Sequence, residues 1–190
     1  MAHAPSDDQE LLRQLAKGNP AAFGACYDRY QGPIFRFAWH MSGDQAQAEE
    51  VTQEVFLRLI DNPRNYDPAK GTLAGYLFGI AHNVLRRQLG SRRLDVPLED
   101  DALDRDNTGL TTEPDILSEL DRRERVELLH KSVSALPEPY REALVLCDLE
   151  EMSYPEAAAI LNCAEGTVAS RLHRARAILK SRLKKMGCVR

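Results

Sequence analysis

The stretch SYPEAAAILNCAEGTVASRLHRARAILKSRL, residues 153–183, decides the fold of the C-terminal half of the chain. Its hydrophobic spacing predicts a short helix at about residues 154–161 and a longer helix at about residues 166–184. The four residues 162–165 between them leave room only for a tight turn, and Asn162 tolerates the left-handed conformation that such a turn needs. A short helix, a tight turn and a long second helix predict a helix-turn-helix.

The longer helix of this motif has two different faces. Apolar residues recur on one face at the spacing of a buried stripe: Val168, Leu172, Ala175 and Leu179. The other side carries polar and basic residues: Thr167, Ser170, Arg171, His173, Arg174 and Arg176. Arginine can pair with guanine through two hydrogen bonds, while threonine and serine contact bases or phosphates. This face therefore predicts DNA binding, although exposed arginines also serve simply to solubilise a helix.

Charge is distributed unevenly along the 190 residues, although the formal net charge is only −4. Eight acidic residues and one base lie between residues 94 and 115, whereas eight bases and one acid lie between residues 164 and 190. The acidic stretch has no sustained periodicity and contains two prolines, which predicts a flexible linker at residues 94–116. The basic stretch predicts either a surface for a polyanion or a solvated tail.

The chain before this linker is helical in pattern. We expect one helix from residue 6 or 7 to Gly18 and a second helix after the capping pair Asn19 and Pro20. Gly32 and Pro33 are expected to break or bend this second helix. Further helices are expected after residue 44 and over residues 72–91, and the turn-forming residues 61–68 are expected to be a loop.

The helix after residue 44 separates its apolar and polar residues cleanly. Its predicted buried stripe consists of Ala48, Val51, Val55 and Leu59. Beyond the linker, residues 116–135 predict a helix that Pro137 ends, and the pair Glu138–Pro139 begins the next helix. No stretch has a β pattern. The sequence therefore predicts an all-α fold with two small helical domains, at residues 1–93 and 117–190, on either side of the linker.

Composition excludes several classes of protein. No apolar run approaches the length that spans a bilayer, and the N-terminus lacks the pattern of a signal peptide, so we expect a cytoplasmic protein without membrane insertion. The four cysteines are widely spaced and contain no CxxC pair, and no histidine pair has ligand spacing. We therefore expect no metal and no cofactor. Neither a nucleophile–base pair nor a phosphate-binding loop is recognisable, so we do not expect an enzyme.

Residues 136–183 closely resemble region 4 of the extracytoplasmic-function sigma factors of bacterial RNA polymerase. The run GTVASRLHRAR, residues 166–176, carries the most specific part of this resemblance. The resemblance implies that Thr167, Ser170, Arg171, His173, Arg174 and Arg176 bind the upstream (−35) promoter element. Ala164 stands where the family usually has a serine, and such a missing helix cap costs about 1 kcal/mol.

Two further stretches resemble region 2 of the same family. AEEVTQEVFLRL, residues 48–59, is similar to the helix that binds the polymerase clamp, and LAGYLFGIAHNVLRR, residues 73–87, is similar to the DNA-melting helix. The resemblance implies two sets of site residues. Polymerase would contact Glu50, Gln53, Glu54, Leu57 and Arg58. The downstream (−10) element would contact Asn65, Tyr76, Asn83, Arg86 and Arg87.

Alternatives to these residue assignments stay open. Tyr76 lies on the apolar side of its helix and suits a core position at least as well as a DNA contact. It also departs from the family, which usually has tryptophan there, as His82 departs from the usual arginine. Glu50, Gln53, Glu54 and Arg58 would equally suit the solvated face of any amphipathic helix.

The family resemblance implies several partners. These are core RNA polymerase, through the β′ clamp helices and the β flap, promoter DNA, and an anti-sigma factor that holds the protein inactive. An active factor would then be associated with the nucleoid. The alternative is a helix-turn-helix regulator with an N-terminal sensing domain, which would usually bind symmetric sites as a dimer.

Overall fold

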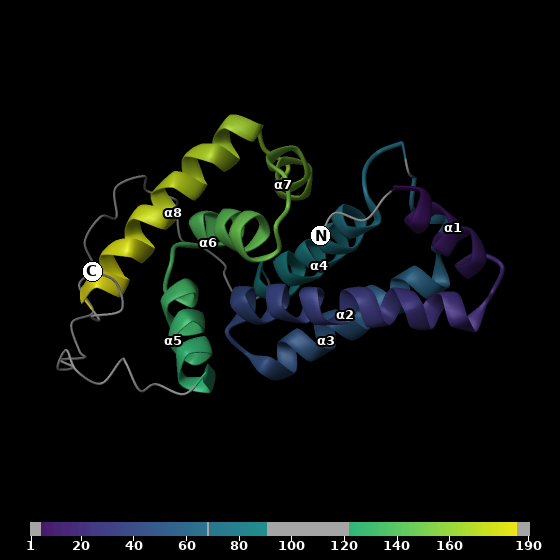
Figure 1. Ribbon diagram of the computed structural model, residues 1–190, viewed down its shortest axis with the longest axis horizontal. Coiled ribbons are helices and arrows are strands. Elements are labelled where there is room, and N and C mark those ends of the chain that lie inside the picture. Colours follow the sequence, from purple (N-terminus) through teal and green to yellow (C-terminus); the bar gives the residue numbers. More distant parts are fainter. Residues whose placement is uncertain (1–4, 68, 91–121, 186–190) are drawn as a thin grey trace.

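The computed structural model describes residues 5–67, 69–90 and 122–185, and this part of the chain is helical without any strand. The helices form two groups, α1–α4 and α5–α8, which pack against each other (Figure 1). The first group consists of α1 (Pro5–Leu15), α2 (Pro20–Ser42), α3 (Gln45–Asp61), the short 3-10 turn η1 (Pro63–Asn65) and α4 (Leu73–Gly90). The second group consists of α5 (Arg122–Ser134), α6 (Glu138–Leu144), the π-helical turn η2 (Val145–Leu149), α7 (Tyr154–Leu161) and α8 (Glu165–Lys185).

The expected helix starts are confirmed by their caps. The Asn19 side chain accepts a hydrogen bond from the Ala21 amide at 3.0 Å, and Pro20 follows as the first residue of α2. The Asp44 carboxylate accepts a hydrogen bond from the Gln47 amide at 3.0 Å at the start of α3. Each side chain binds an amide that has no partner within its own helix.

The break expected at Gly32 and Pro33 does not occur, because α2 is one continuous helix of 23 residues that contains Pro33. Proline removes one backbone hydrogen bond and crowds the preceding turn. Packing outweighs this cost, since buried residues lie on both sides of the proline: Cys26, Tyr30, Ile34, Phe37, Ala38 and Met41. Burial of such a stripe supplies most of a helix's stability in a folded protein.

The core of the first group lies between α2, α3 and α4. The predicted stripe of α3 is confirmed, since Ala48, Val51, Val55 and Leu59 are completely buried. Phe37 on α2 and Phe78 on α4 meet edge to face, with ring centroids 5.4 Å apart. These contacts fix α4 against α2 and leave one side of α3 outward.

The second group contains the predicted helix-turn-helix, formed by α7 and α8. Val168, Leu172 and Ala175 of α8 are buried against α6 and α7. The helix expected at 116–135 is described only from residue 122, and the predicted linker at 94–116 lies outside the described residues. Val126 on α5 is apolar but 49% exposed.

Two pairs of helices bring the two groups into contact. The first helix of the helix-turn-helix, α7, packs against α4, and α5 packs against α2. In Figure 1, α5 lies beside the C-terminal end of α2, while α8 runs along the outer edge of the second group. The α4 helix, which carries the predicted −10 residues, therefore lies against a helix of the other group.

Candidate nucleic-acid and polymerase interfaces

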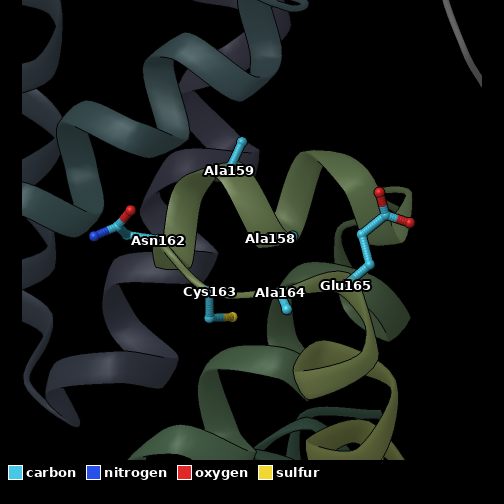
Figure 2. Close-up of a pocket in the computed structure, with 6 residues that line it drawn as sticks. All are labelled: Ala158, Ala159, Asn162, Cys163, Ala164 and Glu165. Carbon is cyan, nitrogen blue, oxygen red and sulfur yellow. The ribbon is translucent and has the colours of Figure 1, made fainter.

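The turn of the helix-turn-helix has the predicted geometry. Asn162 adopts the left-handed conformation, with φ 50° and ψ 50°, and its backbone N–H donates to the Ala158 carbonyl. α7 begins with a capping box in which the Glu156 amide donates to Ser153 Oγ at 3.4 Å and the Ser153 amide donates to Glu156 Oε2 at 3.1 Å. Figure 2 shows the turn after Asn162, where Cys163, Ala164 and Glu165 help to line a shallow surface depression.

The outward face of α8 presents the predicted DNA-binding residues. Ser170, His173, Arg174 and Arg176 are exposed, and Thr167 and Arg171 are partly buried beside the packed stripe. The Ser170 hydroxyl donates to the Thr167 carbonyl at 3.0 Å, which ties it to its own helix. The face is basic and stands on a helix whose opposite side is fixed in the core, as a surface that enters a DNA groove must be.

Two of these arginines have partners within the protein that the sequence did not indicate. The Arg176 guanidinium donates to both carboxylate oxygens of Asp148 on η2, at 2.9 and 2.6 Å. These hydrogen bonds raise the pKa of Arg176 above its ordinary value. Arg174 donates to the Tyr140 hydroxyl on α6 at 3.2 Å. Both side chains are therefore oriented by the scaffold before any DNA is bound.

The candidate −10 surface combines the loop after α3 with the outer face of α4. Tyr66 in this loop donates its hydroxyl to the Gly71 carbonyl at 2.9 Å. Its ring meets that of Tyr76 on α4 edge to face, with centroids 5.6 Å apart. Tyr76 is partly buried, and this burial raises the pKa of its hydroxyl. The tyrosine pair joins the loop to the start of the helix.

The other predicted residues of this surface are exposed. Asn83, Arg86 and Arg87 lie on the later turns of α4, and Asn65 lies at the end of η1. The span from Tyr76 to Arg87 is about 16 Å along the helix axis at 1.5 Å per residue. The surface is thus long enough to follow several nucleotides of an extended strand.

Glu54 links this surface to the candidate polymerase surface on α3. Its carboxylate accepts a hydrogen bond from Arg58 at 2.8 Å and lies 3.8 Å from Arg87 on α4. One carboxylate therefore contacts a residue assigned to polymerase and a residue assigned to DNA. Sequence patterns do not predict this connection, because Glu54 and Arg87 are far apart along the chain.

The outward stripe of α3 is partly apolar. Glu50 and Gln53 are exposed, as predicted, and Leu57 is 56% exposed on the same side. Ile60, which sequence reasoning missed, extends this stripe by one turn and is 47% exposed. Tyr27 on α2 lies nearby at 42% exposure, with its ring 4.8 Å from that of Phe56. Large apolar side chains grouped on a surface mark a site for another protein.

Within the described residues, no group of three or more histidine, cysteine, aspartate or glutamate side chains is placed to hold a metal ion. In the same part of the chain, no helix is both long and apolar enough to cross a lipid bilayer.

Comparison with known proteins identifies the family. The family model for sigma-70 region 2 matches residues 26–94, and the model for sigma-70 region 4 matches residues 126–179. The chain is 33% identical over 155 residues to the ECF RNA polymerase sigma factor SigM of Bacillus subtilis, covering 91% of that protein and 82% of this chain. The chain belongs to the extracytoplasmic-function sigma factors. It is therefore a transcription initiation factor, and the alternative of a regulator with a sensing domain is set aside.

One further relative and one solved structure also resemble the sigma factor. It is 36% identical over 153 residues to SigE of Mycolicibacterium smegmatis, which covers 80% of this chain and 58% of that longer protein. A co-crystal structure of the sigma factor RpoE with the anti-sigma factor NepR from Bartonella quintana matches with a TM-score of 0.64 and 26% identity. That match covers 85% of this chain and 96% of the solved chain.

Proposed function

We propose that the sigma factor uses three surfaces to start transcription. The outward stripe of α3 binds core RNA polymerase, the exposed face of α8 binds the −35 element, and the loop with α4 binds the −10 element. In this proposal the sigma region 2 domain spans residues 1–93 and the sigma region 4 domain spans residues 117–190. The observation that carries the proposal is the position of the two polar DNA surfaces on different helical groups.

The two DNA surfaces suit different forms of DNA. A basic helix held by a helix-turn-helix enters the major groove of an intact duplex, where arginine reads guanine and other side chains hold phosphate. Opened DNA instead needs stacking platforms and a polar groove for its backbone. The Tyr66–Tyr76 pair and the exposed Asn83, Arg86 and Arg87 of α4 offer such a combination.

The polymerase assignment rests on the mixed character of the α3 stripe. Leu57 and Ile60 supply apolar area that costs free energy while it faces water, and Glu50, Gln53, Glu54 and Arg58 supply polar contacts around it. A merely solvated helix face would have no reason to expose two large aliphatic residues one turn apart. We assign the β′ clamp helices to this stripe and the β flap to the region 4 domain.

An anti-sigma factor is the further partner of this proposal. It would cover polymerase-binding faces while the sigma factor is inactive, and the active protein would be nucleoid-associated in the cytoplasm. The partner proposal is tested by isolating proteins that co-purify with the sigma factor from its host without stress. A captured protein must block binding to core polymerase when it is added back, and a captured protein that leaves binding intact would contradict the assignment.

Reconstitution tests the proposed function as a whole. The purified chain is mixed with core RNA polymerase and a library of host genomic fragments, and transcripts are mapped at their 5′ ends. We expect transcripts that start downstream of a shared pair of sequence elements and that are absent with core enzyme alone. Stable binding of the chain to DNA without binding to core polymerase would contradict the proposal.

A further inference from the structure

Two histidines face each other where the two helical groups meet. The Nδ1 atom of His40 on α2 lies 3.2 Å from the Nδ1 atom of His130 on α5, and both residues are buried. The ring of Trp39 stacks on the His130 ring, with centroids 3.7 Å apart and planes inclined by 4°. Three ring systems therefore meet in the contact between α2 and α5.

A close contact between two Nδ1 atoms requires one N–H donor and one lone pair. Two neutral imidazoles meet this requirement in complementary tautomers, and a pair with one added proton meets it as well. When both imidazoles are protonated, two N–H groups and two positive charges face each other. The hydrogen bond is then lost and the charges repel, so the contact can exist only while the pair holds at most one extra proton.

The surroundings of the pair also oppose protonation. Burial, followed by the charges of His130, Arg36 on α2 and Arg141 on α6, lowers the pKa of His40 to about 4. Burial and Arg141 lower the pKa of His130, which Glu127 on α5 raises only in part. His130 Nε2 lies 3.5 Å from the Ser134 hydroxyl. Among the described residues, the charged side chains that act on the pair are therefore mostly cationic.

The sign of the pH dependence follows from these depressed values. Once the groups separate, both histidines return toward an ordinary pKa of about 6.5, so the open state binds more protons than the docked state. The contribution of His40 to docking is complete above about pH 6.5 and is lost as the pH falls toward its docked pKa of about 4, and the contribution of His130 changes in the same direction. Protonation of the histidine pair therefore favours separation.

Other polar contacts cross the same interface. His82 Nε2 on α4 lies 3.0 Å from Glu142 on α6, Thr72 donates to Glu156 on α7 at 2.8 Å, and Arg36 donates to Glu150 at 3.2 and 3.0 Å. Burial raises the pKa of Glu150 to about 7 despite the Arg36 pair. This single carboxyl opposes the histidines, because its contribution to docking grows as the pH falls from about 7 toward 4.5.

We propose that the His40–His130 pair is a proton-sensitive latch between the two helical groups. The latch holds α5 against α2 at neutral and alkaline pH and releases when both rings are protonated. The latch concerns the conformation of the chain and does not depend on the assignment of the DNA surfaces. The functional consequence of the latch rests on that assignment. Because α7 packs on α4, release would uncover the start of the helix assigned to the −10 element.

Hydrogen exchange on the full-length chain tests the latch, because it reports an opening equilibrium even when the open population is small. The opening constant of the α5 amides is measured at pH 7.5 and 5.5, corrected for intrinsic exchange, with the α3 amides as an internal reference. The comparison is made in Glu150→Gln, because the Glu150 carboxyl, whose pKa is about 7, lowers the opening constant of the wild type as the pH falls. In this variant, protonation of His40 alone should raise the α5 opening constant about tenfold between these values, and His130 adds to that factor.

Two variants separate the histidine pair from the rest of the interface. Adding His40→Asn to Glu150→Gln keeps a hydrogen-bonding atom at the Nδ1 position but removes one titrating group, so the rise of the α5 opening constant between the two pH values should become about tenfold smaller. Wild type is the matched control in which Glu150 is present, and its opening constant should rise less than that of Glu150→Gln. The proposal is overturned if α5 of Glu150→Gln opens equally at both pH values, or if adding His40→Asn leaves the response unchanged, which would assign it to another group.

Discussion

The guanidinium of Arg176 on α8 is held in a two-pronged ion pair by the carboxylate of Asp148 on η2, at 2.9 and 2.6 Å. Arg176 lies within the run whose sequence most clearly indicates DNA binding. Its side chain remains 56% exposed, so the pair orients the arginine without removing it from the surface. Asp148 thus partly neutralises the basic face of α8.

Replacing Asp148 with Asn should release the Arg176 charge to bind phosphate. We expect non-specific duplex binding to tighten and the slope of log affinity against log salt to steepen by about one. The stability of the region 4 domain should fall by less than about 1 kcal/mol, because an exposed ion pair contributes little. Titrations of a duplex at several salt concentrations measure the slope, and thermal unfolding measures the stability. A salt slope unchanged from wild type would place Arg176 away from the DNA backbone.

Much of the fold could be predicted because the residues that mark a helix lie close together in the sequence. The caps at Asn19 and Asp44 and the buried stripe of α3 depend on residues within one or two turns of each other. The failure at Pro33 has the opposite cause, since the packing of α2 against α3 and α4 overrides a local breaking signal. Contacts between residues that are distant in the sequence produce no periodic pattern from which they could be predicted.

The exposed faces of the candidate surfaces could be predicted from the sequence, but the contacts between their helices could not. The outward side of α8 follows from its helical period, and so does the exposure of Gln53 on α3. The pairs Arg176–Asp148 and Arg87–Glu54 could not be foreseen, because each depends on how two helices lie in space. The exposed Ile60 was missed because an apolar residue at a helix end is normally assigned to the core.

The apolar part of the α3 stripe should contribute to polymerase binding. Leu57→Asp combined with Ile60→Asp should weaken binding to core polymerase at least tenfold, because two charged groups would have to be buried at the interface. The fold should persist, since both side chains are largely exposed. Fluorescence anisotropy with labelled sigma factor measures the affinity, and circular dichroism measures the helix content.

A matched control exists in the region 4 domain for the charged substitutions. Val126 on α5 is 49% exposed, which is close to the value of Ile60, but it lies on the other helical group. Val126→Asp should weaken binding to core polymerase less than the α3 variant does, because it leaves the proposed clamp contact intact. Equal losses in Val126→Asp and in the α3 variant would mean that the substitutions act through general destabilisation and not through a polymerase contact.

The tyrosine pair should matter for strand opening more than for stability. Tyr66→Phe keeps the ring beside Tyr76 but removes the hydroxyl that donates to the Gly71 carbonyl, at a cost of about 1 kcal/mol. We expect slower opening of the −10 element, because the loop after α3 loses its tether. Stopped-flow fluorescence of a base analogue within that element measures the rate. Unchanged opening kinetics would show that the loop needs no tether.

The most direct test of the account compares Asn83→Ala with Arg174→Ala on two templates, a duplex promoter and the same promoter with its −10 element already unpaired. Arg174→Ala should weaken binding to the −35 duplex by about 1–3 kcal/mol if it reads a guanine, and polymerase carrying it should still engage the unpaired template normally. Asn83→Ala should bind the −35 duplex as wild type does but open the paired template poorly, as a base-analogue signal reports. Normal opening by Asn83→Ala on the paired template, or loss of function by Arg174→Ala on the unpaired one, would contradict the division of labour between α4 and α8.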